Sequence, residues 1–119
     1  MSWPRGRLFV ATEPTDLRRS FDGLSALVAG KFEREVFDGD AFVFRNRRGN
    51  QVRVLYWDRD GYVIWMKRLE AGTFRRLRAE NGEDVLEVDV ARLTMLLEGV
   101  DAKLVTKRKR YARPTKSAA

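Results

Sequence analysis

Side chains that can hold phosphate are concentrated in the segment 45–51, RNRRGNQ, and continue at Arg53. Arginine presents a planar fork of donors that matches phosphate oxygens and guanine edges. A glycine in the same segment lets the backbone approach a partner closely. The pattern therefore predicts that Arg45, Arg47, Arg48 and Arg53 contact nucleic acid. The alternative is a hairpin tip that is charged only because loops lie at the surface and are solvated.

The C-terminal segment, residues 103–119, carries seven basic residues and no acidic residue. Its composition cannot offset the entropy of ordering, which predicts a disordered basic tail. We expect its central run, Lys107, Arg108, Lys109 and Arg110, to bind phosphate backbones with salt-sensitive affinity. Two alternatives stay open: a solubilising tail, and a tail that folds onto the acidic segment 80–101 of its own or another chain.

The charge of the whole chain points to the same partner. There are 24 Lys and Arg against 17 Asp and Glu in 119 residues, a net charge of +7. Residues 45–78 carry +7 and residues 79–102 carry −6, so residues 1–102 sum to zero and the excess lies in the tail. A basic middle, an acidic segment and a basic tail indicate a polyanion as partner. We expect one domain over residues 1–102, followed by the tail.

Residue types that are missing restrict the possible chemistry. The chain has no cysteine and no histidine, which removes thiol and imidazole nucleophiles, bases and metal ligands. Four aspartates remain that could hold Mg²⁺ for phosphoryl chemistry: Asp16, Asp22, Asp58 and Asp60. A helix cap at Asp16 and a turn at Asp58 and Asp60 explain these residues better. We predict no catalytic residue, no metal site and no cofactor.

Two arginines and two tryptophans are candidates for contact with another protein. Arg18 and Arg19 lie at the start of the first expected helix, where acidic residues are preferred. This conflict indicates an external partner or, alternatively, an ion pair with Asp22 one turn along. Trp57 and Trp65 lie on strands with two apolar faces and are candidates for partner contact. A wider aromatic set could offer a platform on which single-stranded bases stack: Phe42, Phe44, Tyr56, Trp57, Tyr62, Trp65 and Phe74. Core packing is the alternative for all of them.

Short periodic segments predict the elements that must position these groups. Leu8-Phe9-Val10-Ala11 suits a first strand, and apolar residues at helical spacing predict a helix from a cap at Thr15 or Asp16 to Gly30. The segments 41–45, 51–57 and 61–67 predict a three-stranded antiparallel meander. Residues 85–88 suit a short strand, and Asp89 suits the cap of a helix that carries Val90, Leu93, Leu96 and Leu97 and ends at Gly99.

The order of these elements predicts an α+β domain, an antiparallel three-stranded meander with additional short strands packed against two helices. Both faces of the meander are substantially apolar, so each face needs a cover. The cover is either the remaining chain or another protein. No apolar run approaches the roughly 18 residues that span a bilayer, and no signal-peptide core follows the N-terminus. We therefore expect a cytoplasmic protein with no membrane contact.

Five blocks of sequence, in order, carry a resemblance to a known family. They are TDLRRSFDGL at 15–24, FVFRNRRGN at 42–50, LYWDRDG at 55–61, KRLEAGTF at 67–74 and LLEGVD at 96–101. Together they resemble the small accessory proteins, called TnpB or Orf2-like, that are encoded by bacterial insertion sequences of family sixty-six. The resemblance covers about residues 8–101. Tyr56-Trp57 stands where many relatives show two tryptophans, and the tail lies outside the shared region.

The resemblance implies a non-catalytic helper in DNA transposition, encoded beside a larger transposase that performs the strand chemistry. It implies no active site. The expected partners are then DNA at the ends of the element and the transposase, with a second copy of the chain as a further candidate. The leading hypothesis is an accessory protein that binds DNA, the transposase or both. The alternative is a protein-only adaptor for the transposase with little direct DNA contact.

Overall fold

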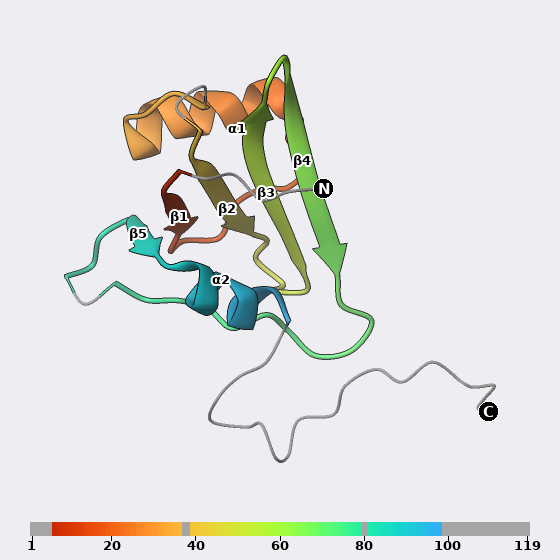
Figure 1. Cartoon of the computed structure of the whole chain (residues 1–119). Helices are drawn as coiled ribbons and strands as arrows, with labels where there is room; N and C mark the ends of the chain where they lie inside the picture. The colour runs from red at the N-terminus through yellow and green to blue at the C-terminus, as the bar shows by residue number, and fades with distance from the viewer. Residues whose placement is uncertain (1–5, 37–38, 80, 99–119) are drawn as a thin grey trace.

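The computed structural model describes residues 6–36, 39–79 and 81–98. Within them the chain forms a five-stranded mixed sheet and two α-helices, which confirms the α+β class (Figure 1). The elements in chain order are β1 (Leu8–Ala11), α1 (Phe21–Leu27), the π-helical turn η1 (Val28–Phe32), β2 (Ala41–Arg45), β3 (Gln51–Asp58), β4 (Gly61–Arg68), β5 (Val85–Val88) and α2 (Val90–Leu97). The predicted disordered tail and the domain boundary at residue 102 lie outside the described residues.

The sheet has five strands, because the short strands expected at 8–11 and 85–88 join the three central strands. Its strand order is β4-β3-β2-β1-β5. Strands β2, β3 and β4 follow one another antiparallel, whereas β1 pairs parallel with β2 and antiparallel with β5. A parallel pair requires a crossover between its strands, and α1 with η1 provides it. The apolar pattern of a four-residue strand marks it as a strand without specifying its neighbour, so this sheet order was not predictable from periodicity.

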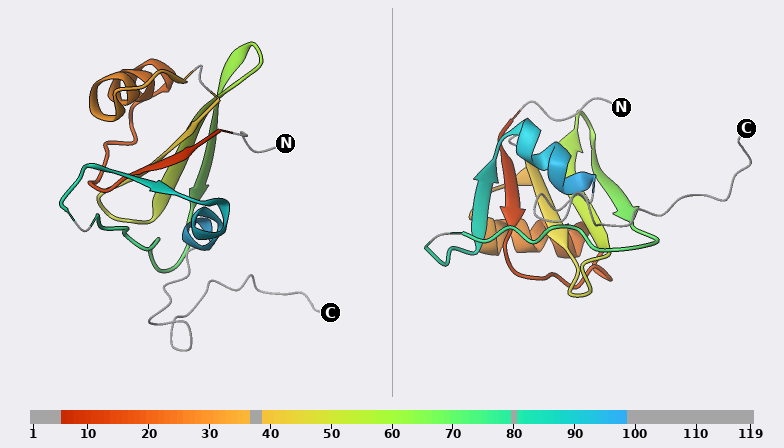
Figure 2. Two further views of the ribbon diagram at one scale, coloured as in Figure 1. Left: turned by 60° about the vertical axis from the view of Figure 1, so that its left-hand side comes forward. Right: turned by 90° about the horizontal axis from the view of Figure 1, so that it is seen from below.

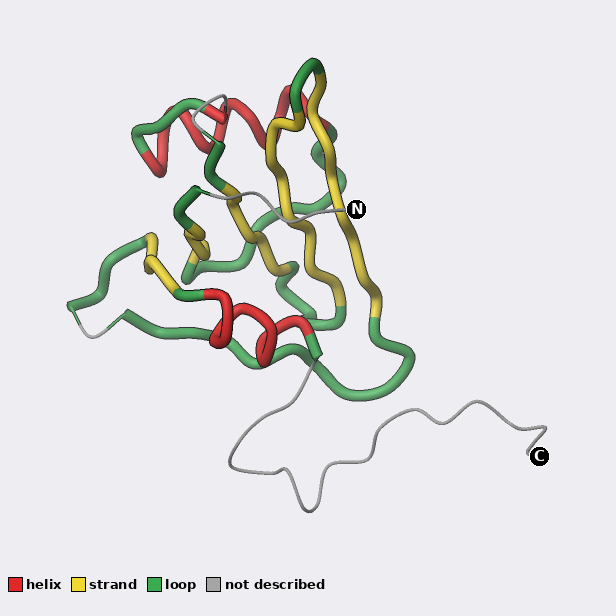
Figure 3. The backbone as a smooth tube through the Cα atoms, in the orientation of Figure 1, coloured by secondary structure: helices red, strands yellow, loops and turns green. Residues whose placement is uncertain are grey.

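Each face of the sheet has its own hydrophobic core, and helices lie on opposite sides (Figure 2). On one side Phe42, Phe44 and Leu55 pack against Leu24 of α1 and Phe32 of η1. The other side is covered by α2 and by the segment 69–79, which has no regular secondary structure and runs beside α2 (Figure 3). The prediction that both faces need a cover is confirmed, and this chain itself supplies the cover.

The first helix begins later than predicted. Its cap is Ser20, and the residues before it form a local turn in which Asp16 Oδ1 accepts from the Arg18 backbone N–H at 3.0 Å. Asp side chains compete with helices by bonding nearby backbone groups in this way. As a result Phe21 lies in the first turn of α1 and is 42 % exposed.

The second helix begins as predicted. The Asp89 carboxylate accepts from the Arg92 backbone N–H at 2.8 Å, which satisfies one of the free donors at the helix start. Leu93, Leu96 and Leu97 are buried, but Val90 is 63 % exposed, so the apolar stripe is covered only from Leu93 onward. None of the helices in the described ranges is long and apolar enough to cross a membrane.

Candidate nucleic-acid interface

The arginine-rich turn between β2 and β3 is organised by the side chain of Asn46. Its Oδ1 accepts from the backbone N–H groups of Gly49 and Gln51, at 2.9 and 3.0 Å. Its Nδ2 donates to Asn50 Oδ1 at 2.9 Å. Gly49 occupies the left-handed region at φ 79°, which glycine adopts without steric cost. Arg47 and Arg48 are therefore exposed on a turn with a defined backbone.

The same turn is tied to the irregular segment behind it. The Phe74 backbone N–H donates to Gly49 O at 2.7 Å, and the Leu69 N–H donates to Asn50 O at 2.8 Å. Arg45 Nε donates to Phe74 O at 3.2 Å, and its guanidinium lies where a Cβ on Gly49 would project. Burial, and then the charge of Arg76, lower the pKa of Arg45. Arg45 thus supports the turn from behind, unlike Arg47 and Arg48.

An open groove of about 1000 Å³ separates this turn from the segment before α1. The residues that line it are Pro14, Thr15, Asp16, Leu17, Arg18, Asn46, Arg47, Arg48, Gln51 and Arg53. We call it the basic groove, because its lining has four guanidinium groups and one carboxylate. Two hydrogen bonds join its walls: the Thr15 N–H donates to Arg45 O at 2.8 Å, and Arg53 Nη1 donates to Arg19 O at 2.8 Å.

The one carboxylate of the groove is engaged by a groove arginine. Arg18 Nε and Nη2 bind both oxygens of Asp16 at 2.9–3.2 Å. The hydrogen bonds from the Arg18 side chain and backbone lower the pKa of Asp16 to about 2, so Asp16 is ionised at neutral pH. The alternative of an ion pair between Arg18 and Asp22 is wrong, because the turn at 16–19 gives Arg18 the Asp16 carboxylate as its partner. This exposed pair is expected to stabilise the fold little.

Arg53 forms part of the wall of the basic groove, and its guanidinium group does not extend away from the wall. It is half-buried on β3, and its Nη1 is held by the Arg19 carbonyl. Its Nε is fully enclosed and has no hydrogen-bond partner among the residues that the structure describes. An enclosed donor without an acceptor costs free energy, on the order of 1–3 kcal/mol. The groove therefore contains one anchored guanidinium, one that is paired, and two, on Arg47 and Arg48, that project from the turn.

The structure separates the remaining predicted residues from this groove. The Arg19 side chain packs beside Gly23, where an added Cβ would lie 3.0 Å from Arg19 Cβ. Trp57 packs on the α1 side of the sheet, and Trp65 packs on the α2 side. The two tryptophans therefore do not form one stacking platform. Lys107, Arg108, Lys109 and Arg110 lie outside the described residues.

Sequence reasoning missed one wall of the groove, residues 14–18. Nothing local in these residues points to the β2–β3 turn, because the contact joins segments about thirty positions apart in sequence. The only usable signal was the pair Arg18 and Arg19, which we assigned to a partner and not to this groove. The uncharged groove residues Asn46 and Gln51 were visible only as part of the RNRRGNQ segment.

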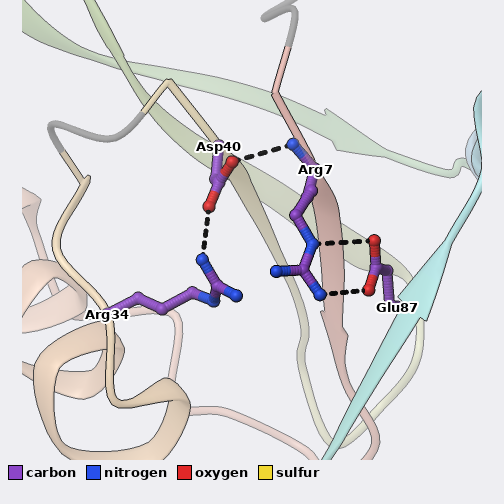
Figure 4. Close-up of polar contacts among 4 residues, drawn as sticks. All are labelled: Arg7, Arg34, Asp40 and Glu87. Atoms are coloured by element: carbon purple, nitrogen blue, oxygen red, sulfur yellow. Dashed lines mark hydrogen bonds and ion pairs between the residues drawn. The ribbon is translucent and has the colours of Figure 1, made fainter.

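A second group of charges lies near the start of β1 and is neutralised internally (Figure 4). Arg7 Nε and Nη2 bind the Glu87 carboxylate at 3.0 and 2.6 Å, which raises the pKa of Arg7 and lowers that of Glu87. Buried Asp40 accepts from the Arg7 backbone N–H at 2.8 Å and from Arg34 Nη1 at 3.0 Å. These arginines have carboxylate partners and are poor candidates for phosphate binding.

The aspartates considered for a metal ion are not gathered into a site. Across the described ranges no group of three or more Asp, Glu, His or Cys residues could hold a metal ion. Asp16 is paired with Arg18, and Asp58 and Asp60 flank Arg59 in the β3–β4 turn, where the Asp60 N–H donates to Asp58 O at 2.6 Å.

Comparisons with known proteins found one family model and related chains of similar length. The family model described as IS66 Orf2 like protein matches residues 6–107. "Uncharacterized protein y4jC" of Sinorhizobium fredii is 39 % identical over 112 residues, which cover 94 % of this chain and 93 % of that protein. "Uncharacterized protein y4hO" of the same organism is 36 % identical over 95 residues, 80 % of this chain and 81 % of that protein. No solved structure matches.

The matched region is wider than the expected 8–101 and includes Lys103 and Lys107. The part of the tail that begins the basic run is therefore shared with the family, while the rest lies beyond the match. The groove residues and both helices lie inside the matched region. Because the family model covers most of the chain, the chain belongs to the IS66 Orf2-like family.

Proposed function

We propose that this chain is a non-catalytic accessory protein of DNA transposition that binds the DNA backbone in the basic groove. Membership of the IS66 Orf2-like family suggests an accessory role in transposition. The observation that carries the DNA contact is the convergence of Arg18, Arg47, Arg48 and Arg53 on one open groove. The residues come from two segments, so the convergence is a property of the fold and not of a single charged loop.

The chemistry of the groove suits phosphate. Guanidinium groups bind phosphate oxygens through paired, charge-assisted hydrogen bonds. Asn46 holds the turn that presents Arg47 and Arg48, so less backbone entropy is lost when DNA binds than with an unstructured loop. Such contacts position a protein on a duplex without reading its sequence. The groove by itself therefore supports backbone binding, and preference for the ends of the element requires a further contact.

A second candidate function is a protein-only adaptor that binds the transposase. The feature that favours it is the charge balance of residues 1–102, whose net charge is zero. In that case the groove would accept acidic side chains of the transposase. The tail would then provide whatever DNA contact remains.

Fluorescence anisotropy with the full chain separates the two functions. The duplexes carry either the end of the element or a scrambled sequence, across a salt series. A matched variant replaces Lys107, Arg108, Lys109 and Arg110 by glutamine and leaves the groove intact. We expect the variant to keep salt-dependent binding, because the groove still neutralises phosphates. Loss of all binding in this variant would favour the adaptor.

Replacing Asp16 by asparagine is expected to strengthen DNA binding. The change removes the one negative charge of the groove and releases the Arg18 guanidinium for phosphate, while the amide oxygen can still accept from the Arg18 N–H. We expect a gain of several-fold in affinity and a salt slope steeper by about one, as for one added phosphate contact. Anisotropy titrations measure both. Asp22→Asn, outside the groove lining, is the control for loss of one charge; equal gains in both variants would contradict a local effect.

A further inference from the structure

The strand β4 lies at the rim of the sheet and presents an open edge. In the part of the chain that the structure describes, β4 pairs only with β3. It is eight residues long, twice the length of β5 at the opposite rim. Neither helix lies along its outer side (Figures 1 and 2). A long strand with unpaired backbone groups on one side is a template for pairing with another strand.

Exposed apolar side chains flank the same edge. Met66, in β4, is 64 % exposed. Alternation along the strand places Met66 on the α1 side with Tyr62 and Ile64, which pack against that core. Phe21 of α1, 42 % exposed, stacks on the Tyr62 ring at 6.4 Å between centroids. Two of the four large hydrophobic residues that are exposed in the described ranges thus lie beside one strand edge.

We propose that β4 pairs antiparallel with β4 of a second copy of this chain, about a two-fold axis, so that the two sheets become continuous. The occupant is inferred from the self-complementary segment DGYVIWMKR at 60–68, which has an acidic residue at one end, a basic residue at the other and apolar residues between them. An isologous contact presents the same surface twice, so each favourable pair is formed twice. This inference concerns a different surface from the basic groove and does not depend on DNA binding.

Charge complementarity selects the register. In an antiparallel pair about a two-fold axis normal to the sheet, one residue lies opposite its own copy. An axis at Ile64 places Asp60 of each copy opposite Arg68 of the other. An axis at Trp65 instead places Asp60 opposite Glu70, a repulsive pair. An axis at Val63 places Asp60 opposite Met66. Of these three registers, the Ile64 register is the one that places Asp60 opposite a basic residue.

The same register also covers the exposed apolar residues. With Ile64 at the axis, Met66 of one copy lies opposite Tyr62 of the other, on the face where Phe21 stacks. Thioether sulfur packs favourably against aromatic rings. The pairing therefore removes Met66 from water and gives Phe21 an apolar neighbour across the interface, in addition to new backbone hydrogen bonds.

Sedimentation equilibrium of the full chain without DNA tests the proposal. At concentrations up to about 100 µM, in the affinity range of weak protein complexes, we expect a dimer of twice 13.8 kDa. Met66→Lys is expected to raise the dissociation constant at least about tenfold, because a charge at a strand edge opposes pairing. Met95→Lys, at a 46 % exposed residue of α2, is the matched control and is expected to leave it unchanged. A chain that is monomeric throughout, or a dimer that Met66→Lys leaves intact, overturns the proposal.

Charge reversal tests the register and the identity of the occupant. Asp60→Arg and Arg68→Asp are each expected to weaken the dimer, and the double variant to restore it. A double variant no tighter than the single variants overturns the register. Hydrogen exchange of β4 amides is expected to slow as the protein concentration rises. Slow exchange that is independent of concentration would identify a segment of the same chain at this edge and overturn pairing between copies.

Discussion

Replacing Arg47 and Arg48 together by alanine is expected to lower affinity for a DNA duplex by about ten- to a hundredfold at about 0.1 M salt. Both side chains are exposed on a turn that Asn46 holds, and both line the basic groove. Each lost phosphate contact reduces the slope of log affinity against log salt by about one, so the pair is expected to reduce it by about two. Anisotropy titrations over a salt series measure affinity and slope together.

The control removes the same charge from elsewhere on the surface. Arg78 and Arg92 are exposed and lie outside the groove lining, so alanine at both lowers the net charge by the same amount. We expect this variant to bind DNA nearly as well as the parent chain. Equal losses in the two double variants would show that total charge, and not the groove, sets the affinity.

Replacing Asn46 by alanine is expected to destabilise the fold by about 2 kcal/mol and to weaken DNA binding as well. The change removes the acceptor of two backbone N–H groups and the donor to Asn50. Half-buried amides left without an acceptor cost on the order of 1–3 kcal/mol each, less where water can replace the side chain. Urea denaturation measures the loss of stability, and anisotropy shows whether the loosened turn still presents Arg47 and Arg48.

Asn46→Asp separates the acceptor from the rest of the side chain. Its carboxylate can still accept from the Gly49 and Gln51 N–H groups but cannot donate to Asn50. We expect less than half of the stability loss of the alanine variant. DNA affinity still falls, because the carboxylate adds a negative charge to the groove. Equal loss of stability in both variants would show that the two backbone hydrogen bonds do not hold the turn.

Patterns within a few residues predicted much of the fold. Alternating apolar residues predicted strands at 41–45, 51–57 and 61–67, of which the last two extend one residue further in the structure, and Asp89 predicted the start of α2. The central strands have two apolar faces, which correctly predicted that both faces of the sheet are covered. The start of α1 was wrong because Thr15 and Asp16 suit a cap and a turn equally well, and Asp16 forms the turn. Local propensity cannot decide between two local structures of similar free energy.

The residue types of the candidate site could be predicted from the sequence, whereas its geometry could not. Arg47, Arg48 and Arg53 are close in sequence, and the structure leaves them in one groove. Arg45, from the same segment, instead supports the turn by binding Phe74 O. For Arg18 the sequence left open an external partner or an ion pair with Asp22, and its carboxylate partner in the structure is Asp16. Which guanidinium groups face solvent depends on packing, which residue type does not encode.

The sequence alone was enough to establish an α+β class, an excess of positive charge in the centre and tail, and the absence of thiol and imidazole chemistry. These follow from residue types and from spacing within one element. The tertiary structure alone decided that β1 lies between β2 and β5, that residues 14–18 face the arginine turn, and that β4 forms the rim of the sheet within the described residues. Each of these depends on the order of strands in the sheet, and that order is set by contacts between residues far apart along the chain.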